Sequence, residues 1–217
     1  MSMRSSAPDV VARHTTPRGE LVLRRAGAHY EIISNGVFLM DTRDGRSERL
    51  LVAAALEGRR SARVLIGGLG VGYSLTEALR HDAVHQVTVV EIEPAVIEWH
   101  ATHLAAVSGH VLDDPRVTVA CADLPAWLAS AGERFDVIAV DVDNGPGWTV
   151  TPDNASLYDD AGLAALARRL APGGALSVWS AAASPAFARR LRRHFGEVDV
   201  HTVDVARGEP DHVYVAR

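Results

Sequence analysis

Three acidic residues stand in positions of the sequence where a carboxylate can do chemistry. Glu91, Asp123 and Asp141 each lie at or just after the end of an apolar run that is typical of a buried strand. A carboxylate in such a place is costly unless it binds something. Ligands of open α/β sheets bind outside the carboxyl ends of the strands. We therefore expect these acids to lie in one ligand pocket.

A glycine-rich stretch precedes the first of these acids. Gly67-Gly68-Leu69-Gly70-Val71-Gly72 follows the apolar run Val64–Ile66 and opens a helical pattern, and Glu91 stands nineteen residues after the last glycine. Glycines allow the backbone to approach a ligand without a Cβ in the way, and a helix N-terminus offers free N–H groups. An acid at the end of the second strand can accept hydrogen bonds from both ribose hydroxyls. This combination predicts a nucleotide pocket.

The spacing of the glycines indicates which nucleotide this is. The dinucleotide fingerprint G-x-G-x-x-G, read from Gly68, would end at Tyr73, which argues against a nicotinamide oxidoreductase. The spacing G-x-G-x-G fits Gly68–Gly72 and resembles the loop of enzymes that bind S-adenosylmethionine. Asp123 either accepts from the adenine amino group or caps a helix over Leu124–Ala131, and both roles can coexist. The predicted ligand contacts are Gly67, Gly68, Leu69, Gly70, Gly72, Glu91, Ile92, Ala122 and Asp123.

Asp141 is the expected catalytic residue. An alkyl amine must lose a proton before it attacks a sulfonium carbon, and a neighbouring carboxylate can accept that proton. Asp143 would face the other side of the strand if the strand continues, but it would reach the pocket if the strand bends. Asn144 and Trp148 lie in a loop that could close over an acceptor, although Trp148 could equally anchor the loop. Tyr158 either lines the acceptor side or packs at the start of a helix.

Strands that alternate with helices must position these residues. Several of the expected strands are apolar throughout, as is typical of a parallel sheet that helices cover on both faces. The expected strands are Ala62–Ile66, Gln86–Glu91, Arg116–Cys121, Phe135–Val142 and Ala175–Trp179, and the expected helices are Val71–Arg80, Pro94–Leu104, Leu124–Ala131, Tyr158–Leu170 and Pro185–Phe195.

The C-terminal end departs from this alternation. No helix fits between the strand-like runs Val198–Asp204 and His212–Ala216, so they must be antiparallel neighbours. The sequence thus predicts an α/β fold of the methyltransferase type. Its mostly parallel, Rossmann-like sheet would have seven strands and close with an antiparallel hairpin.

The N-terminal part predicts a separate small unit. Residues 20–41 read as antiparallel strands separated by turns such as Asn35-Gly36, which is a strong hairpin signal. A helix is expected over Glu48–Leu56. The predicted organisation is a disordered tail over residues 1–19 without a signal-peptide pattern, a β unit with one helix over 20–58, and a catalytic domain over 59–217.

Composition excludes several function classes. The formal charge of −5 argues against a broad surface for nucleic acid or anionic membranes, and no apolar run is long enough to span a membrane. The single cysteine, Cys121, lies in an apolar strand pattern, so we expect a buried thiol and a cytoplasmic protein without disulfides. His100 and His103 share a helix but lack a third ligand, so no metal site is expected.

At this point the chain resembles the spermidine synthase family of aminopropyltransferases. The resemblance rests on the glycine stretch and on four further motifs: Glu91-Ile92-Glu93-Pro94, Asp113-Asp114-Pro115-Arg116-Val117, Phe135-Asp136-Val137-Ile138 before Asp141, and Leu170-Ala171-Pro172-Gly173-Gly174. It implies that Glu91 holds the ribose, Asp123 the adenine, and that Asp141 accepts the amine proton. It also implies a homodimer. The chain departs from the family pattern at Leu69, Asn144 and Arg46-Ser47-Glu48.

The predicted function is transfer of an alkyl group from S-adenosylmethionine, or from its decarboxylated form, to a small-molecule amine. Because the departures lie on the acceptor and tail sides, the sequence leaves open whether aminopropyl or methyl is transferred, and it puts genuine spermidine synthesis in doubt. A methyltransferase of a small metabolite and a non-catalytic nucleoside-binding protein are the alternatives.

Overall fold

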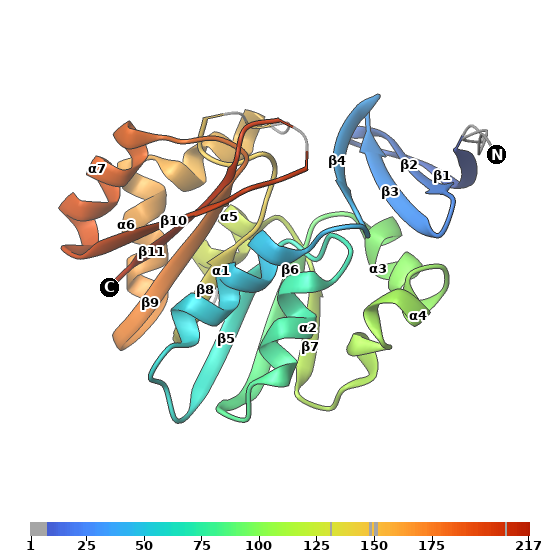
Figure 1. Ribbon diagram of the computed structural model, residues 1–217. Helices are drawn as coiled ribbons and strands as arrows, with labels where there is room; N and C mark the ends of the chain where they lie inside the picture. Colours follow the sequence, from blue (N-terminus) through green and yellow to red (C-terminus); the bar gives the residue numbers. More distant parts are fainter. Residues whose placement is uncertain (1–7, 131, 148, 150–151, 207) are drawn as a thin grey trace.

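The main body of the protein is one twisted sheet covered by helices (Figure 1). The computed structural model describes residues 8–130, 132–147, 149, 152–206 and 208–217, so Trp148 lies outside the described residues. Within them, seven strands form this sheet in the order β10-β11-β9-β8-β5-β6-β7. Their bounds are β5 Ala62–Gly67, β6 Val84–Glu91, β7 Val117–Cys121, β8 Phe135–Val140, β9 Leu170–Ser180, β10 Val198–Val203 and β11 Asp211–Ala216.

The strand directions confirm the predicted fold class. Parallel pairs join β5 to β6 and β8, β6 to β7, and β8 to β9. The last strand, β11, runs antiparallel to both β9 and β10. The sheet is therefore parallel at its centre, and its carboxyl ends gather the residues that follow β5, β6, β7 and β8.

Helices cover both faces of this sheet. The α-helices are α1 Arg46–Leu56, α2 Tyr73–Arg80, α3 Pro94–Ala101, α4 Ala105–Ser108, α5 Leu124–Ser130, α6 Asp160–Arg169 and α7 Pro185–Phe195, and two 3₁₀ segments are η1 Val111–Asp113 and η2 Pro152–Tyr158. The helix expected over Pro94–Leu104 ends at Ala101, and a separate helix, α4, begins at Ala105. The helix expected from Tyr158 begins at Asp160, because the side chain of Asp159 accepts the N–H of Gly162 as an N-cap.

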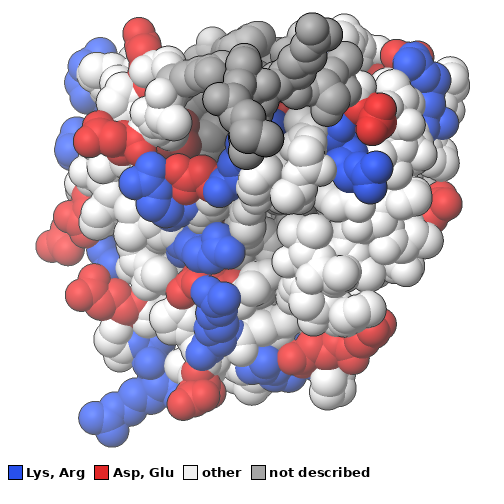
Figure 2. All heavy atoms as spheres, turned by 45° about the vertical axis from the view of Figure 1, so that its right-hand side comes forward, with Lys and Arg blue, Asp and Glu red and all other residues white. Residues whose placement is uncertain are grey.

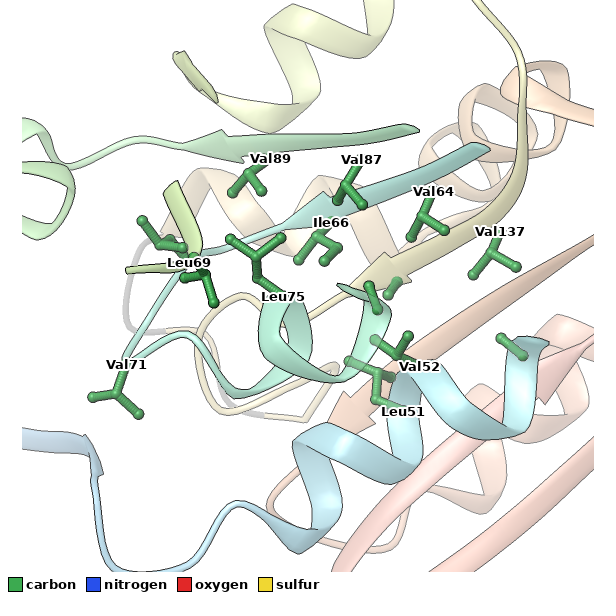
Figure 3. Close-up of a cluster of buried hydrophobic side chains, with 14 of the residues drawn as sticks. Leu51, Val52, Val64, Ile66, Leu69, Val71, Leu75, Val87, Val89 and Val137 are labelled. Carbon is green, nitrogen blue, oxygen red and sulfur yellow. The ribbon is translucent and has the colours of Figure 1, made fainter. Parts of the chain in front are cut away.

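Successive residues of the central strands face two different cores. Val64 and Ile66 of β5 pack against α1 and α2, where Leu51 and Leu75 belong to the same cluster (Figure 3). Leu65, which lies between them in the sequence, joins the other cluster with residues of α5, α6 and α7. This alternation follows from the pleat of a strand. It explains why β5 is apolar throughout.

A four-stranded antiparallel sheet lies beside the main body, as the described residues show. Its strands are β1 Asp9–Thr16, β2 Gly19–Ala26, β3 His29–Ser34 and β4 Val37–Asp41. The structure thus corrects the expectation of a disordered tail over residues 1–19, since residues 9–16 pair with β2. β1 is an edge strand whose residues are polar after the short run Val10-Val11-Ala12 and whose side chains are exposed or half-buried, so it lacks the apolar alternation of a buried strand.

Side-chain contacts fix the small sheet over the carboxyl end of β6. Arg18, in the turn between β1 and β2, donates to Glu93 Oε1 at 2.6 Å and to the Ile92 carbonyl at 2.9 Å. The rings of His14 and Trp99 meet edge to face with their centroids 5.8 Å apart. The small sheet therefore covers the edge of the main sheet at which the predicted ligand residues lie.

The molecular surface carries both signs of charge. On the face in Figure 2, arginine and acidic side chains are interspersed rather than gathered in one patch. In the part of the chain that the structure describes, no helix is long and apolar enough to cross a membrane.

Candidate active site

A cavity lies between the small sheet and the carboxyl ends of the central strands. Its wall combines predicted ligand residues with others that the sequence did not single out. The predicted ones that line it are Gly68, Gly70, Glu91, Ile92, Ala122, Asp123, Asp141 and Asp143, and the others include Met40, Glu48, Glu93, Asn154 and Trp179. Gly67, Leu69, Gly72, Asn144 and Tyr158 are not part of this wall.

The glycine loop needs its glycines for close packing. Gly68 has a φ of +93°, and a Cβ on it would lie 2.0 Å from the Asp141 carbonyl oxygen. Gly70 has a φ of +50°, and a Cβ there would lie 2.3 Å from the sulfur of Met40. A side chain at either position would meet both steric crowding and an unfavourable backbone conformation. The loop can therefore pack closely between the end of β8 and Met40 of the small sheet.

Leu69 contributes its backbone to the site and its side chain to the core. Its side chain is only 4% exposed and packs with Leu75 and Ile66 in the cluster under α2 (Figure 3). Its N–H donates to Glu91 Oε2 at 2.8 Å. A ligand in the cavity would therefore contact the backbone of the loop at Leu69 rather than the leucine side chain.

Backbone N–H groups hold Glu91 in one orientation. Its Oε2 accepts from Leu69, and its Oε1 accepts from the N–H of Glu93 at 2.8 Å. Burial raises the pKa of Glu91, and the two backbone hydrogen bonds oppose that shift. Each carboxylate oxygen still has acceptor capacity beyond its one backbone bond. This geometry suits an acid that receives the two hydroxyls of a ribose.

Asp123 performs the capping role that the sequence predicted as one of its two alternatives. Its Oδ2 accepts the N–H of Ala126 at 3.2 Å, and its carbonyl accepts the N–H of Trp127 at 2.9 Å, at the start of α5. Because Asp123 also lines the cavity, its second oxygen can still serve a ligand. The adenine contact stays a prediction.

Asp141 lies where β8 ends, at the centre of the cavity wall. Its N–H donates to the carbonyl of Gly67 at 2.8 Å, and Ser74 Oγ donates to its Oδ2 at 3.1 Å. Burial, together with the negative charges of Asp211 and Glu91, raises the pKa of Asp141 to about 6. A carboxylate with such a pKa is largely ionised at neutral pH and is still basic enough to take a proton.

Glu48 is a cavity residue that sequence reasoning missed. It lies in the first turn of α1 and is 8% exposed, and it faces the same cavity as Asp141. Burial and the nearby charge of Asp141 raise the pKa of Glu48 to about 8. The signal was present in the sequence, because Arg46-Ser47-Glu48 stands out as a place where the chain departs from the family pattern.

The predicted acceptor residues separate into two groups. Asp143 lines the cavity with a φ of +55°, and Asn154 Nδ2 donates to its Oδ2 at 2.8 Å. Tyr158 instead is buried, donates its hydroxyl to the Val142 carbonyl at 2.9 Å and packs edge-on against Phe187. Asn144 is also buried, and its carbonyl accepts the N–H of Ala181 at 3.2 Å. Tyr158 and Asn144 thus support the loop after β8 rather than facing the cavity.

The thiol of Cys121 differs in its exposure from the sequence-based prediction. Cys121 is exposed, because it ends the edge strand β7, so the prediction of a buried thiol is wrong.

His100 is buried, and its Nε2 lies 3.0 Å from the Gly70 carbonyl while its Nδ1 lies 3.3 Å from Ser108 Oγ. Burial lowers the pKa of His100. A neutral His100 therefore supports the glycine loop from behind.

The cavity is strongly acidic. The carboxylates in its wall are Glu48, Glu91, Glu93, Asp123, Asp141 and Asp143, and among the described residues that line it there is no arginine, lysine or histidine. Arg18 offsets Glu93 from outside through the 2.6 Å ion pair. Buried charges of one sign favour ligands of the opposite sign. The cavity thus suits positively charged ligands.

Comparison with known proteins places the chain in a family. The Spermine/spermidine synthase domain matches residues 46–193, which is more than half of the chain. The chain belongs to this family. The resemblance inferred from the sequence motifs is thereby confirmed. The matched residues 46–193 of the chain contain the glycine loop, Glu48, Glu91, Asp123 and Asp141.

Curated relatives support the same assignment. The chain is 33% identical over 186 residues to a protein of Ralstonia nicotianae named Polyamine aminopropyltransferase 2, covering 84% of this chain and 35% of the relative. It is 36% identical over 176 residues to the Polyamine aminopropyltransferase of Mycobacterium tuberculosis strain H37Rv, covering 79% of this chain and 32% of the relative. This family member thus spans about a third of the length of the curated relatives it matches.

Solved structures share the fold. A spermidine synthase in complex with the transition state analogue AdoDATO superposes with a TM-score of 0.81 at 20% identity, covering 96% of this chain and 73% of the other. The spermidine synthase of Thermotoga maritima gives a TM-score of 0.76, also at 20% identity, covering 96% and 72%. These comparisons confirm the fold of the family member.

Proposed function

We propose that this chain transfers the aminopropyl group of decarboxylated S-adenosylmethionine to a small-molecule amine. The observation that carries the proposal is the acidic cavity whose described lining residues include no basic side chain. Both reactants are cations, because the donor has a sulfonium and an ammonium group and the acceptor is an amine that is protonated at neutral pH. Intact S-adenosylmethionine would bring a carboxylate among these acids, which disfavours methyl transfer.

The donor would lie along the glycine loop and β6. In this arrangement Glu91 accepts the ribose hydroxyls, Ala122 and Asp123 contact the adenine, and Gly68 and Gly70 lie along the sulfonium side of the donor. Leu69 and Glu93 contribute by fixing the carboxylate of Glu91 through their N–H groups. The preorganised carboxylate needs no rearrangement when the donor binds.

Asp141 would act as the proton acceptor of the reaction. With an amine pKa near 10.4, a neutral amine at pH 7 costs about 4–5 kcal/mol. Asp141 takes the proton from the ammonium group of the acceptor. The nitrogen then forms a bond to the carbon next to the sulfonium, the C–S bond breaks, and its electron pair leaves with sulfur as a thioether nucleoside. Alignment of the two reactants can contribute roughly 7–11 kcal/mol.

The names of the relatives support a polyamine or its diamine precursor as the acceptor. The Ralstonia and Mycobacterium proteins are both named polyamine aminopropyltransferase. Glu48, Asp141 and Asp143 line the cavity and would form its acceptor side. Several carboxylates suit a substrate with more than one ammonium group. We therefore include spermidine synthesis from a diamine among the reactions of this proposal.

A product analysis tests the proposal. The purified chain is incubated with a linear diamine and either decarboxylated S-adenosylmethionine or S-adenosylmethionine, and the nucleoside products are separated by chromatography with mass detection. We expect methylthioadenosine and an aminopropylated amine from the decarboxylated donor. S-Adenosylhomocysteine formed from S-adenosylmethionine would overturn the proposal in favour of methyl transfer. Binding of both donors without any product would favour a nucleoside-binding role.

A further inference from the structure

One serine hydroxyl lies between two carboxyl groups at the acceptor side of the cavity. Ser47 Oγ is 2.9 Å from Glu48 Oε2 and 2.7 Å from Asp211 Oδ2, and both distances are those of hydrogen bonds. A serine hydroxyl has a single proton to donate. It can therefore serve only one of the two carboxylates. The second contact requires a proton on the other carboxyl group, which then donates to the serine oxygen.

The surroundings of this triad favour retention of that proton. No arginine, lysine or histidine of the described chain forms an ion pair with Glu48, Asp141 or Asp211. The groups that face it or act on it electrostatically are Asp44 and Arg46 at the start of α1, Ser74 of α2, Asp141 after β8, Trp179 of β9 and His212 of β11. Arg46 and His212 partly offset the acids, while burial raises the pKa values of Glu48 and Asp211. Two carboxyl groups that a hydroxyl bridges, without an ion-paired cation, are stabilised when they share one proton.

The two acids also differ in their access to solvent. Glu48 faces the cavity and is nearly buried, whereas Asp211 is partly exposed at the start of β11. Ser47 connects them, so a proton can pass from the cavity side to the solvent side by exchange of hydrogen bonds. Ser74 approaches from α2, where its Oγ lies 3.3 Å from the Glu48 carbonyl and 3.1 Å from Asp141 Oδ2. The triad therefore lies beside the proposed base.

We propose that Glu48, Ser47 and Asp211 share one proton in the free protein and release it when a cationic substrate enters the cavity. Glu48 then becomes a second carboxylate beside Asp141 and positions the ammonium group of the acceptor. The inference rests on the proposed function for the identity of that cation. The positive charge of the substrate stabilises the ionised form of Glu48, and the proton leaves by way of Asp211. Substrate binding is therefore linked to the release of a proton.

Calorimetry of the full chain tests this linkage. Methylthioadenosine and 1,4-diaminobutane are the probes, and the binding enthalpy of the diamine is measured at pH 7 in two buffers that differ in ionisation enthalpy. We expect binding to release roughly one proton, the amount set by a group that titrates between free and bound states. Glu48→Gln and Ser47→Ala should each reduce the release strongly. Glu57→Gln, which changes an exposed acid just beyond the same helix, is the matched control and should release as much as the wild type.

An infrared measurement tests the shared proton without any ligand. A protonated carboxyl group has a carbonyl band distinct from that of a carboxylate, and we expect such a band at neutral pH in the wild type. The band should decrease in Glu48→Gln or in Asp211→Asn. If Glu48→Gln does not fold, Ser47→Ala takes its place and should alter the frequency of the band.

The outcomes separate this inference from the proposed function. Diamine binding without proton release, or an unchanged release in both Glu48→Gln and Ser47→Ala, overturns the inference while aminopropyl transfer stands. An infrared spectrum without a protonated carboxyl band that depends on Glu48 or Asp211 overturns it as well. Failure to bind any cationic probe overturns the proposed function, and the infrared spectrum still decides whether the proton is shared.

Discussion

The two halves of the cavity hold their acids by different means. On the donor side, Glu91 and Asp123 accept hydrogen bonds from backbone N–H groups of the glycine loop, of Glu93 and of α5. On the acceptor side, Glu48 and Asp141 accept from the side-chain hydroxyls of Ser47 and Ser74. Backbone N–H groups are fixed donors, whereas a hydroxyl can reverse its role. The proposed donor side thus holds its acids in fixed orientations, and the proposed acceptor side can rearrange its hydrogen bonds.

The largest effect is expected from Asp141→Asn, which removes the proposed proton acceptor and keeps the shape of the side chain. Turnover should fall by about 10²–10⁴-fold, the usual contribution of a general base, while methylthioadenosine binding stays close to that of the wild type. Steady-state kinetics and calorimetry measure the two quantities. Unchanged turnover would show that Asp141 takes no part in proton transfer. Equal losses of turnover and methylthioadenosine binding would show that Asp141 also acts in nucleoside binding.

Glu91→Ala should act on the donor side alone. It removes the acceptor of the Leu69 and Glu93 N–H groups and the proposed acceptor of the ribose hydroxyls, so methylthioadenosine affinity should fall by roughly 10- to 100-fold, as for hydrogen bonds to a charged group. Diamine affinity should change little. Asp199→Ala, an exposed acid paired only with Arg217 among the described residues, is the control. Unaltered nucleoside affinity would mean that Glu91 does not hold the ribose.

Gly68→Ala tests the backbone on which the donor side depends. The new Cβ would meet the Asp141 carbonyl oxygen at 2.0 Å with a φ of +93°, so we expect a loss of stability of about 1–3 kcal/mol together with weaker nucleoside binding. Gly27→Ala is a matched control, because its φ is +65° but nothing lies within 4 Å of the added Cβ. Urea unfolding measures the difference. Equal losses in both variants would show that strain alone, and not crowding at the site, accounts for the effect.

The last prediction concerns the pH dependence of stability on the proposed acceptor side. The pKa of Glu48 is raised to about 8 in the folded protein and is near 4.3 in an unfolded chain. Its protonated form therefore stabilises the fold fully below the unfolded pKa, and this contribution is lost as pH rises to about 8. Glu48→Gln should lessen the fall in unfolding free energy between pH 5 and pH 8 by at least about 1.4 kcal/mol. A profile parallel to that of the wild type would contradict the raised pKa.

The sequence predicted the parts of the molecule that follow from local chemistry. Val64–Ile66, the glycines and the placement of Glu91, Asp123 and Asp141 at strand ends were sufficient to predict the sheet and to bring these acids to one cavity, because strand ends of a parallel sheet converge. The strand β1 was missed, because its one apolar run, Val10-Val11-Ala12, is short and does not alternate with polar residues.

The acceptor side was harder to predict because it depends on tertiary packing. Glu48 reaches the cavity from α1, and Ser47 connects it to Asp211, which lies 163 positions further along the chain than Glu48. Tyr158 was a candidate substrate contact, yet its ring fills the core and its hydroxyl binds the Val142 carbonyl. Neither outcome follows from spacing, since both depend on which face of an element meets its neighbour.

Gly70 and Met40 fill one volume between them. The Met40 sulfur occupies the space that a side chain at position 70 would need; Met40 belongs to β4 of the small sheet, and Gly70 to the loop after β5 of the main sheet. A larger residue at position 70 therefore demands a smaller or displaced one at position 40, so the two positions are sterically coupled. Substituting Met40 and Gly70 as a pair, rather than singly, is the natural route to reshape this end of the cavity.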